Sequence, residues 1–151
     1  LSASSLTAAA PAGAGDLAPF VGTWSGDWNP GPGSNGKFRA LDLEIRPGGK
    51  IVETWYRYQK QDDGTVKTSK TSHAVTKYKV SGQTLLLTTH VASFKFERQP
   101  PGPTDIEESL ELQGKDEAVF KALSNSLLAE AKRKGGLVPP EPPPIAMKRR
   151  S

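Results

Sequence analysis

The chain has 151 residues, of which 35% are hydrophobic and 24% charged, the balance of one ordinary globular domain. It contains no cysteine, so disulfides, thiolate metal sites and a cysteine nucleophile are excluded. The net charge of +4 comes from the end of the chain, because residues 131–151 carry six Lys or Arg against one acidic residue. Nucleic-acid binders spread basic residues over a folded face and add aromatic stacking positions, which this segment lacks. The charge therefore argues against a nucleic-acid partner.

Residues 1–18 form a predicted flexible leader. They open with LSASSLTAAAPAGAG, small residues of the kind left around a signal-peptide cleavage site. This segment predicts a secreted or periplasmic protein, and a disordered leader unrelated to export is the alternative. No apolar run approaches the ~20 residues that a membrane span needs, so no transmembrane segment is predicted.

After the leader, clusters of Gly, Pro, Asn, Asp and Ser recur about every eight to twelve residues, as in all-β sandwiches and barrels. Between them, apolar and polar residues alternate with period two: Leu41, Leu43 and Ile45, for example, are separated by acidic residues. We predict strands near 23–28, 38–46, 50–59, 71–80, 84–90, 92–98, 105–113, 116–123 and 144–149. Short connections favour an antiparallel meander, and closing it removes exposed edges, so we expect an up-and-down β-barrel of about eight to ten strands.

Residues 124–134 fit two structures. Their leucines fall at helical spacing, with Ser124 in the position of an N-cap and Gly135 at the end. A strand fits the alternation of Leu127, Ala129 and Ala131 with polar residues after a Ser-Asn-Ser turn. Propensity alone favours the helix.

The first predicted strand opens with the sequence FVGTW at 20–24, which resembles the Gly-x-Trp signature of the calycins, the superfamily of lipocalins, fatty-acid-binding proteins and nitrobindins. Within that superfamily, the sequence resembles bacterial lipocalin-like domains more closely. The shared pattern continues with a Gly-rich turn at 31–36, a long strand at 41–45, a turn at 48–49, an aromatic strand at 55–56 and a last strand ending in Arg at 145–149. The resemblance implies one barrel domain over residues 19–150, although the Pro-rich connection at 135–144 departs from it.

The resemblance also implies how the barrel closes. In calycins the Trp closes one end, and an Arg from the last strand lies across its ring, a contact worth about 1–2 kcal/mol. Arg149 is in phase with Ile145 and Met147, so we expect it, rather than Arg150, on the ring of Trp24. Gly22, Trp24 and Arg149 are thus the predicted structural signature.

For the ambiguous segment, the resemblance favours a hairpin. In the closest pattern residues 126–134 would be a ninth strand and 144–149 a tenth, because an even number lets a meander close antiparallel. Lipocalins proper instead place a helix before the last strand. The hairpin predicts a ten-stranded barrel.

A barrel of this size can enclose a small molecule. The candidate ligand-binding residues are polar side chains in phase with interior apolar positions: Arg39, Tyr56, Tyr58, Tyr78 and Glu108. The opposite phase of the strand at 51–58 would point Glu53, Trp55 and Arg57 inward. Arg39 with Tyr78 would suit a carboxylate, as in fatty-acid-binding barrels, whereas Arg39 with Glu108 would form an internal ion pair. We expect a non-catalytic binding protein for a small hydrophobic or carboxylate-bearing ligand.

Two other function classes stay open. A barrel filled by its own aromatic side chains, Phe94, Phe96, Phe120 and Trp55, would be an interaction or inhibitor module. Some calycin-like barrels are isomerases or cyclases, which keeps an enzyme as the third class.

No catalytic residue is predicted. The sequence has no Ser-His-acid spacing and no Gly-rich phosphate loop, and Glu107 and Glu108 face opposite sides of one strand. His73 and His90 are the only histidines, and a single strand-end histidine is typically solvated, so neither a metal nor a haem cofactor is expected.

Overall fold

The structure, a computed structural model, describes residues 10–11, 16–28, 37–94, 100–136, 138 and 143–150, with the backbone alone at residues 10–11, 28 and 37–39. Its elements are β1 (Ala10–Pro11), the short 3-10 helix η2 (Ala18–Phe20), β2 (Gly22–Trp28), β3 (Lys37–Ile45), β4 (Ile51–Lys60), β5 (Val66–Ala74), β6 (Lys77–Ser81), β7 (Thr84–Phe94), β8 (Gly102–Leu112), β9 (Glu117–Asn125), α1 (Ser126–Arg133) and β10 (Ile145–Arg150). In this part of the chain no helix has the length and apolarity to cross a membrane.

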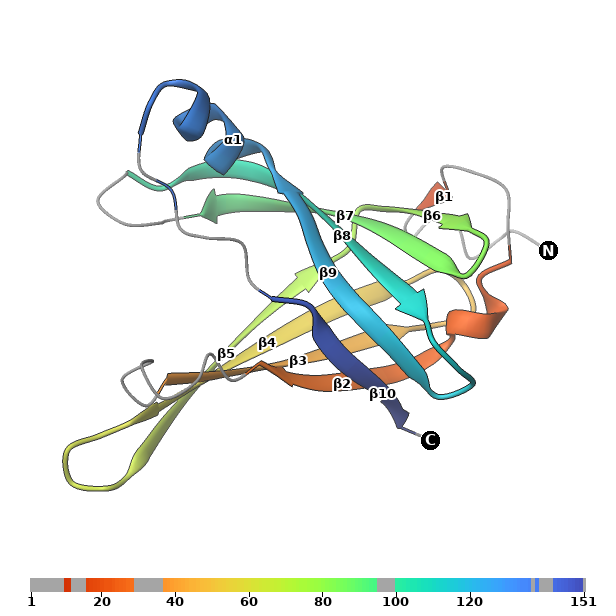
Figure 1. Cartoon of the computed structure of the whole chain (residues 1–151), viewed down its shortest axis with the longest axis horizontal. Helices are drawn as coiled ribbons and strands as arrows, with labels where there is room; N and C mark the ends of the chain where they lie inside the picture. Colours follow the sequence, from red (N-terminus) through yellow and green to blue (C-terminus); the bar gives the residue numbers. More distant parts are fainter. Residues whose placement is uncertain are drawn as a thin grey trace.

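Strands β2 to β10 form one antiparallel sheet that curls into a half-barrel (Figure 1). Strands β2–β5 are one meander, here called the first leaf, and β6–β10 are another, the second leaf. Pairing of β10 with β2 joins the leaves. The far edge of the first leaf is β5, and the far edge of the second is β6, which pairs in parallel with the two residues of β1. The predicted all-β, antiparallel up-and-down fold is confirmed.

The core lies between the leaves and follows the period-two pattern of the strands. Leu41, Leu43 and Ile45 are buried, whereas Asp42 and Glu44 lie on the outer face, as predicted. Apolar side chains from the other strands complete the core: Trp24, Ile51, Val80, Leu85, Leu87, Leu110, Ala118, Phe120, Ile145 and Met147. Because each such side chain gains about 1.5–3 kcal/mol on burial, this pattern sets which face of each strand turns inward.

The single strand predicted at 71–80 is wrong, because the chain forms β5 and β6 there. The backbone N–H of Val75 donates to Ile51 in the first leaf, and that of Thr76 donates to Thr88 in the second. The chain thus crosses between leaves at these two residues. Nothing local marks the crossing, since the segment contains neither Gly nor Pro.

The two strands predicted at 84–90 and 92–98 are one strand, β7, as far as Phe94, and residues 95–99 lie outside the described residues. The pairing of β7 with β8 shifts register between Val91 and Phe94. A bulge inserts an extra residue without a turn, so the strand continues through the irregularity.

The predicted hairpin at 126–134 is also wrong, because these residues form the helix α1. The side chain of Asn125, rather than Ser124, caps it by accepting from the backbone N–H groups of Leu127 and Leu128, each at 3.2 Å. Gly135 ends the helix with φ +82°, where its N–H donates to Lys132. Local capping thus outweighs the strand pattern.

The end of the half-barrel beside η2 is closed by the predicted contact between Arg149 and Trp24. The guanidinium carbon lies 4.5 Å from the centroid of the Trp24 ring, and the two residues are register partners on β10 and β2. Trp24 is fully buried, and its indole N–H donates to the carbonyl oxygen of Phe20 at 2.9 Å. The expectation is confirmed for Arg149, whereas the side chain of Arg150 is largely exposed.

Arg149 also ties three chain segments together through hydrogen bonds. Its Nη1 donates to the carbonyl oxygens of Pro19 and Val21, both at 2.9 Å. Its Nη2 donates to the carbonyl oxygen of Lys115, and its Nε to Asp116 at 3.1 Å. Four of the five guanidinium N–H donors are therefore hydrogen-bonded at the same time as the ring contact is made.

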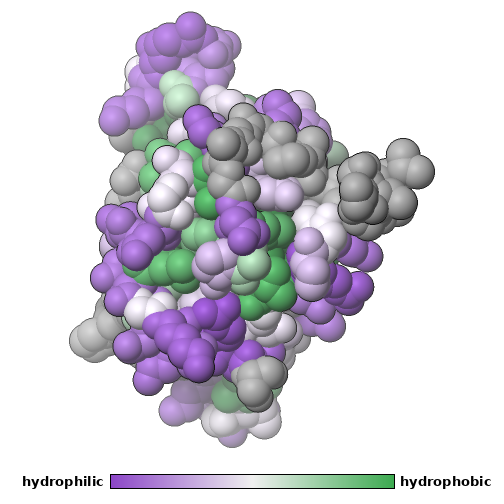
Figure 2. All heavy atoms as spheres, turned by 90° about the vertical axis from the view of Figure 1, so that its right-hand side faces the viewer, coloured by the Kyte–Doolittle hydropathy of each residue, from purple (hydrophilic) through white to green (hydrophobic). Residues whose placement is uncertain are grey.

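Residue 22 must be glycine because the side chain of Arg149 packs directly against it. Its φ is +136°, a conformation that side-chain-bearing residues rarely adopt, and an added Cβ would lie 2.9 Å from Cδ of Arg149. Figure 2 looks onto this end of the molecule, where apolar side chains occupy the middle of the face and hydrophilic ones surround them. The Gly-x-Trp motif thus has a packing role at this end.

Candidate functional site

The phase of β4 decides which side chains reach the interior. Glu53 is the register partner of Leu43, and Trp55 that of Leu41, so both share the face of the buried leucines. Tyr56 lies on the outer face, where its hydroxyl donates to Asp42 at 3.2 Å. The structure therefore has the alternative phase of this strand, in which Glu53 and Trp55 point inward.

The prediction that Tyr56 and Tyr58 point inward is therefore wrong. Their rings stack on the outer face, with centroids 6.4 Å apart and planes 9° apart. Burial and the nearby carboxylate of Asp42 raise the pKa of Tyr56. The error arises because both faces of β4 carry residues that favour strands, so alternation alone does not choose between them.

Glu53 is buried on the inner face of the first leaf, with 2% of its surface exposed. The indole N–H of Trp55 donates to its Oε1 at 3.2 Å. Its register partner on β5 is His73, which is half-buried. Trp55, on the same strand, thus supplies a donor to one oxygen of Glu53.

Glu108 faces the interior from the second leaf, as predicted, and is 5% exposed. Its register partners are Leu87 on β7 and Ala122 on β9. Burial raises the pKa of Glu108 well above its ordinary value, and the charge of Glu53 and a hydrogen bond to it raise the pKa further. The two carboxyl groups, from opposite leaves, therefore act on each other in the interior, and the raised pKa favours the protonated form of Glu108.

Three buried side-chain oxygens have no hydrogen-bond partner among the described residues: Oε2 of Glu53, Oε1 of Glu108 and Oγ1 of Thr89. Thr89 is 1% exposed and pairs with Ile106, which makes it the diagonal neighbour of Glu108 on the inner face. A proton between the carboxyl groups satisfies two of these oxygens at most. The polar cluster of Glu53, Glu108 and Thr89 is the candidate site.

Aromatic rings from both leaves border this cluster. Trp55 meets Phe120 of β9 edge to face, with ring centroids 6.0 Å apart and planes 69° apart. Tyr78, one of the predicted ligand residues, is half-buried against the core and pairs with Leu87, the residue that also pairs with Glu108. Tyr78 therefore lies on the same row of side chains as the cluster.

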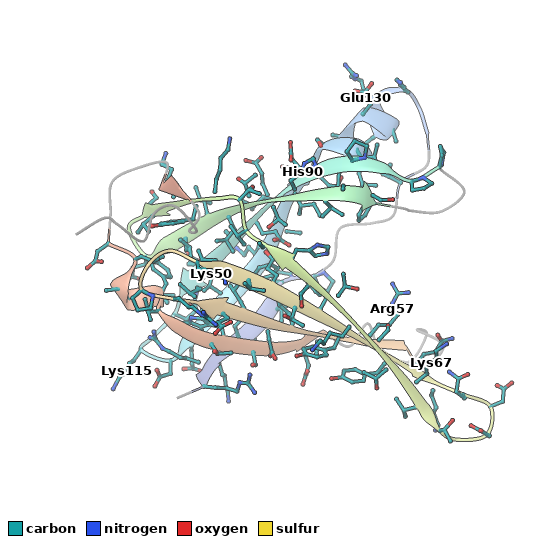
Figure 3. The ribbon with its side chains drawn as sticks, turned by 180° about the vertical axis from the view of Figure 1, so that it is seen from behind. Lys50, Arg57, Lys67, His90, Lys115 and Glu130 are labelled. Atoms are coloured by element: carbon teal, nitrogen blue, oxygen red, sulfur yellow. The ribbon has the colours of Figure 1, made fainter. Side chains whose placement is uncertain are left out.

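The remaining predicted residues lie elsewhere. The side chain of Arg39 is outside the described residues, so its pairing with Tyr78 or Glu108 stays a prediction. His90 is exposed on the second leaf and hydrogen-bonds Asp105 at 2.8 Å (Figure 3). Arg57 lies on the first leaf near the hairpin that carries Lys67 (Figure 3). Among the described side chains, no group of three or more His, Cys, Asp or Glu is placed to hold a metal ion.

The chain was also compared with known proteins. No protein-family model, no curated protein sequence and no solved structure matches it. The groups that the site offers are two buried carboxyls, a hydroxyl and an indole.

Proposed function

We propose that this protein binds a small molecule inside the half-barrel, at the cluster of Glu53, Glu108 and Thr89. The observation that carries the proposal is the set of three buried oxygens without a partner among the described residues. Each buried polar atom left without a partner costs about 1–3 kcal/mol, which a ligand with hydrogen-bond donors would recover. A non-catalytic binding role follows.

Trp55, Phe120 and Tyr78 supply the apolar part of the proposed site. Ligand sites in proteins combine apolar and aromatic walls with a few converging polar groups. The Gly-x-Trp strand with Arg149 across the ring of Trp24 supports a place for this chain among the calycins, whose members include many small-ligand carriers.

An isomerase-type enzyme is a second candidate, favoured by one observation. A carboxyl group with a raised pKa beside a carboxylate is an acid and a base within reach of one substrate. Binding remains our main proposal because it needs only the donors and acceptors described above.

Native mass spectrometry of the full chain, purified without denaturation, tests the binding proposal. We expect an added small-molecule mass on the wild type that is lost from the Glu53→Gln/Glu108→Gln double variant. Glu107→Gln, a change at the exposed outer neighbour whose carboxylate accepts from Ser124, is the matched control and should keep the added mass. A wild type without added mass, which also shows no thermal shift with a library of small molecules, would contradict the proposal.

A further inference from the structure

We infer that the ligand is an organic cation, such as a primary amine, whose charged head lies at Glu53 and Glu108. The inference rests on the proposed function and names the chemical class that the same site selects. Its basis is the geometry of two buried carboxyl groups from opposite leaves, with a hydroxyl beside them and an aromatic ring next to one of them.

The charge of the site favours a cation. Glu53 and Glu108 are both buried acidic groups, so any charge that they carry in this environment of low dielectric is negative. An ammonium head offers three donors, which match the free oxygens of Glu53, Glu108 and Thr89 in number. A carboxylate would bring a second negative charge and no donor, so the site disfavours the fatty-acid type of ligand considered from the sequence.

The aromatic neighbours suit the same class of ligand. Trp55 is already oriented by its hydrogen bond to Glu53 and by its contact with Phe120. An aromatic ring near a cation adds about 0.5–2 kcal/mol when the pair is desolvated. An amine with an apolar tail would therefore contact both the carboxyl pair and the rings.

Other titratable groups on the inner face are few. From the strands next to the pair, these are His73, opposite Glu53 on β5, Tyr78 on the row of Glu108, and Arg57, which is exposed two residues beyond Trp55. Arg57, which could attract an anion, is exposed, and the side chain of its register partner Arg39 lies outside the described residues. Among the described side chains, the buried acidic groups at this face are thus Glu53 and Glu108.

Binding of the cation displaces the proton of the pair. The incoming ammonium keeps its own three protons, and the proton on Glu108 leaves for solvent, so the net charge of the occupied site equals that of the free site. Because protonation competes with the ligand, affinity should rise about tenfold per pH unit until Glu108 ionises in the free protein. A neutral ligand would show no such dependence.

The experiment compares three probes of one shape with the full chain: 2-phenylethylamine, 2-phenylethanol and phenylacetate. Isothermal titration calorimetry at about pH 6, where the amine is charged, in two buffers of different ionisation enthalpy measures affinity and released protons together. We expect the amine to bind about tenfold or more tightly than the alcohol, with release of up to one proton. Hexylamine, hexanol and hexanoate repeat the comparison with an aliphatic tail.

The outcomes separate the two claims. If the carboxylates or alcohols bind as tightly as the amines, the cation inference is overturned while the proposed function stands. If no member of either series binds, the cation inference is overturned, and the added mass in native mass spectrometry decides the proposed function separately. Glu108→Gln should abolish the proton release and Glu107→Gln should retain it, and thermal unfolding of each variant establishes that it is folded.

Discussion

Arg149 and Glu53 lie on one row of inner side chains but differ in how far their polar atoms are hydrogen-bonded. Arg149, Trp24, Leu43, Glu53 and His73 are successive register partners from β10 to β5. At one end, the guanidinium of Arg149 and the indole of Trp24 are hydrogen-bonded to backbone carbonyl oxygens. Further along, Glu53 has a buried oxygen without a partner among the described residues.

This difference separates a structural role from a binding role. A charged group whose donors are mostly hydrogen-bonded to the chain holds segments together and has little capacity left for a ligand. A buried carboxyl pair with free oxygens costs stability, and this cost supports the binding role that we propose. The variants below test this contrast, from the largest expected effect to the smallest.

The largest effect is expected at the closed end. Arg149→Ala removes the ring contact and the hydrogen bonds that join three segments, so the free energy of unfolding should fall by about 3 kcal/mol. Urea denaturation measures it. Arg150→Ala, at an exposed neighbour whose contact with Asp42 is 3.5 Å long, should change it by less than about 0.5 kcal/mol. An equal fall in the free energy of unfolding for both variants would contradict a structural role for Arg149.

Gly22→Ala should destabilise the protein by about 2 kcal/mol. It combines strain at φ +136° with a close approach to Arg149, whereas Gly82→Ala adds a methyl group at φ +61° into open space. The Gly82 variant should therefore lose only about 1 kcal/mol. If the two variants lose the same amount in chemical denaturation, Arg149 does not press on Gly22 and the closed end is looser than described.

The interior pair should make stability depend on pH in the opposite sense to an ion-paired acid. The folded state raises the pKa of Glu108 above its ordinary value of 4.5, so the folded state holds a proton that the unfolded state has lost. The contribution of protonated Glu108 to the free energy of unfolding is complete below pH 4.5, its ordinary pKa. This contribution is lost as the pH rises through the raised pKa of the folded state, by at most about 1.4 kcal/mol per pH unit.

Glu108→Gln should remove this decline, while Glu107→Gln should keep it. The measurement is urea denaturation of the three proteins from about pH 4 to about pH 8, the range in which a raised carboxyl pKa would lie. A wild type and a Glu108 variant with the same pH dependence would contradict the buried pair.

The smallest effect concerns α1. Asn125→Ala should cost about 1 kcal/mol because it removes the cap of the helix, whereas Ser124→Ala should cost less, since the hydroxyl of Ser124 donates to the exposed Glu107. Thermal unfolding ranks the two. If Ser124→Ala costs more than Asn125→Ala, Ser124 is the N-cap of α1, as predicted from the sequence.

The closed end was predictable because its signals are local. Gly22 and Trp24 lie two residues apart in the chain, and Arg149 shares its strand phase with Ile145 and Met147. The helix α1 was also visible in the leucine spacing, although the family resemblance favoured a hairpin. At this segment, capping and propensity predicted the structure better than the resemblance did.

The interior pair was not predictable because it depends on the curl of the sheet. Glu53 and Glu108 are far apart in the sequence and meet only when β4 and β8 face each other across the core. The phase of β4 was ambiguous, and Thr89 resembles any strand threonine. A useful signal would have been the position of Glu53 two residues before Trp55. Residues two apart in a strand face the same side, so an inward-facing Trp55 implies an inward-facing Glu53.

The most direct test of the interior site is an NMR titration of the glutamate side-chain carboxyl carbons in the full chain. We predict that Glu108 ionises well above its ordinary pKa of 4.5, and that 2-phenylethylamine lowers this pKa. A Glu108 that titrates at its ordinary value, with or without the amine, would place the carboxyl group in water and contradict the buried pair on which the account depends.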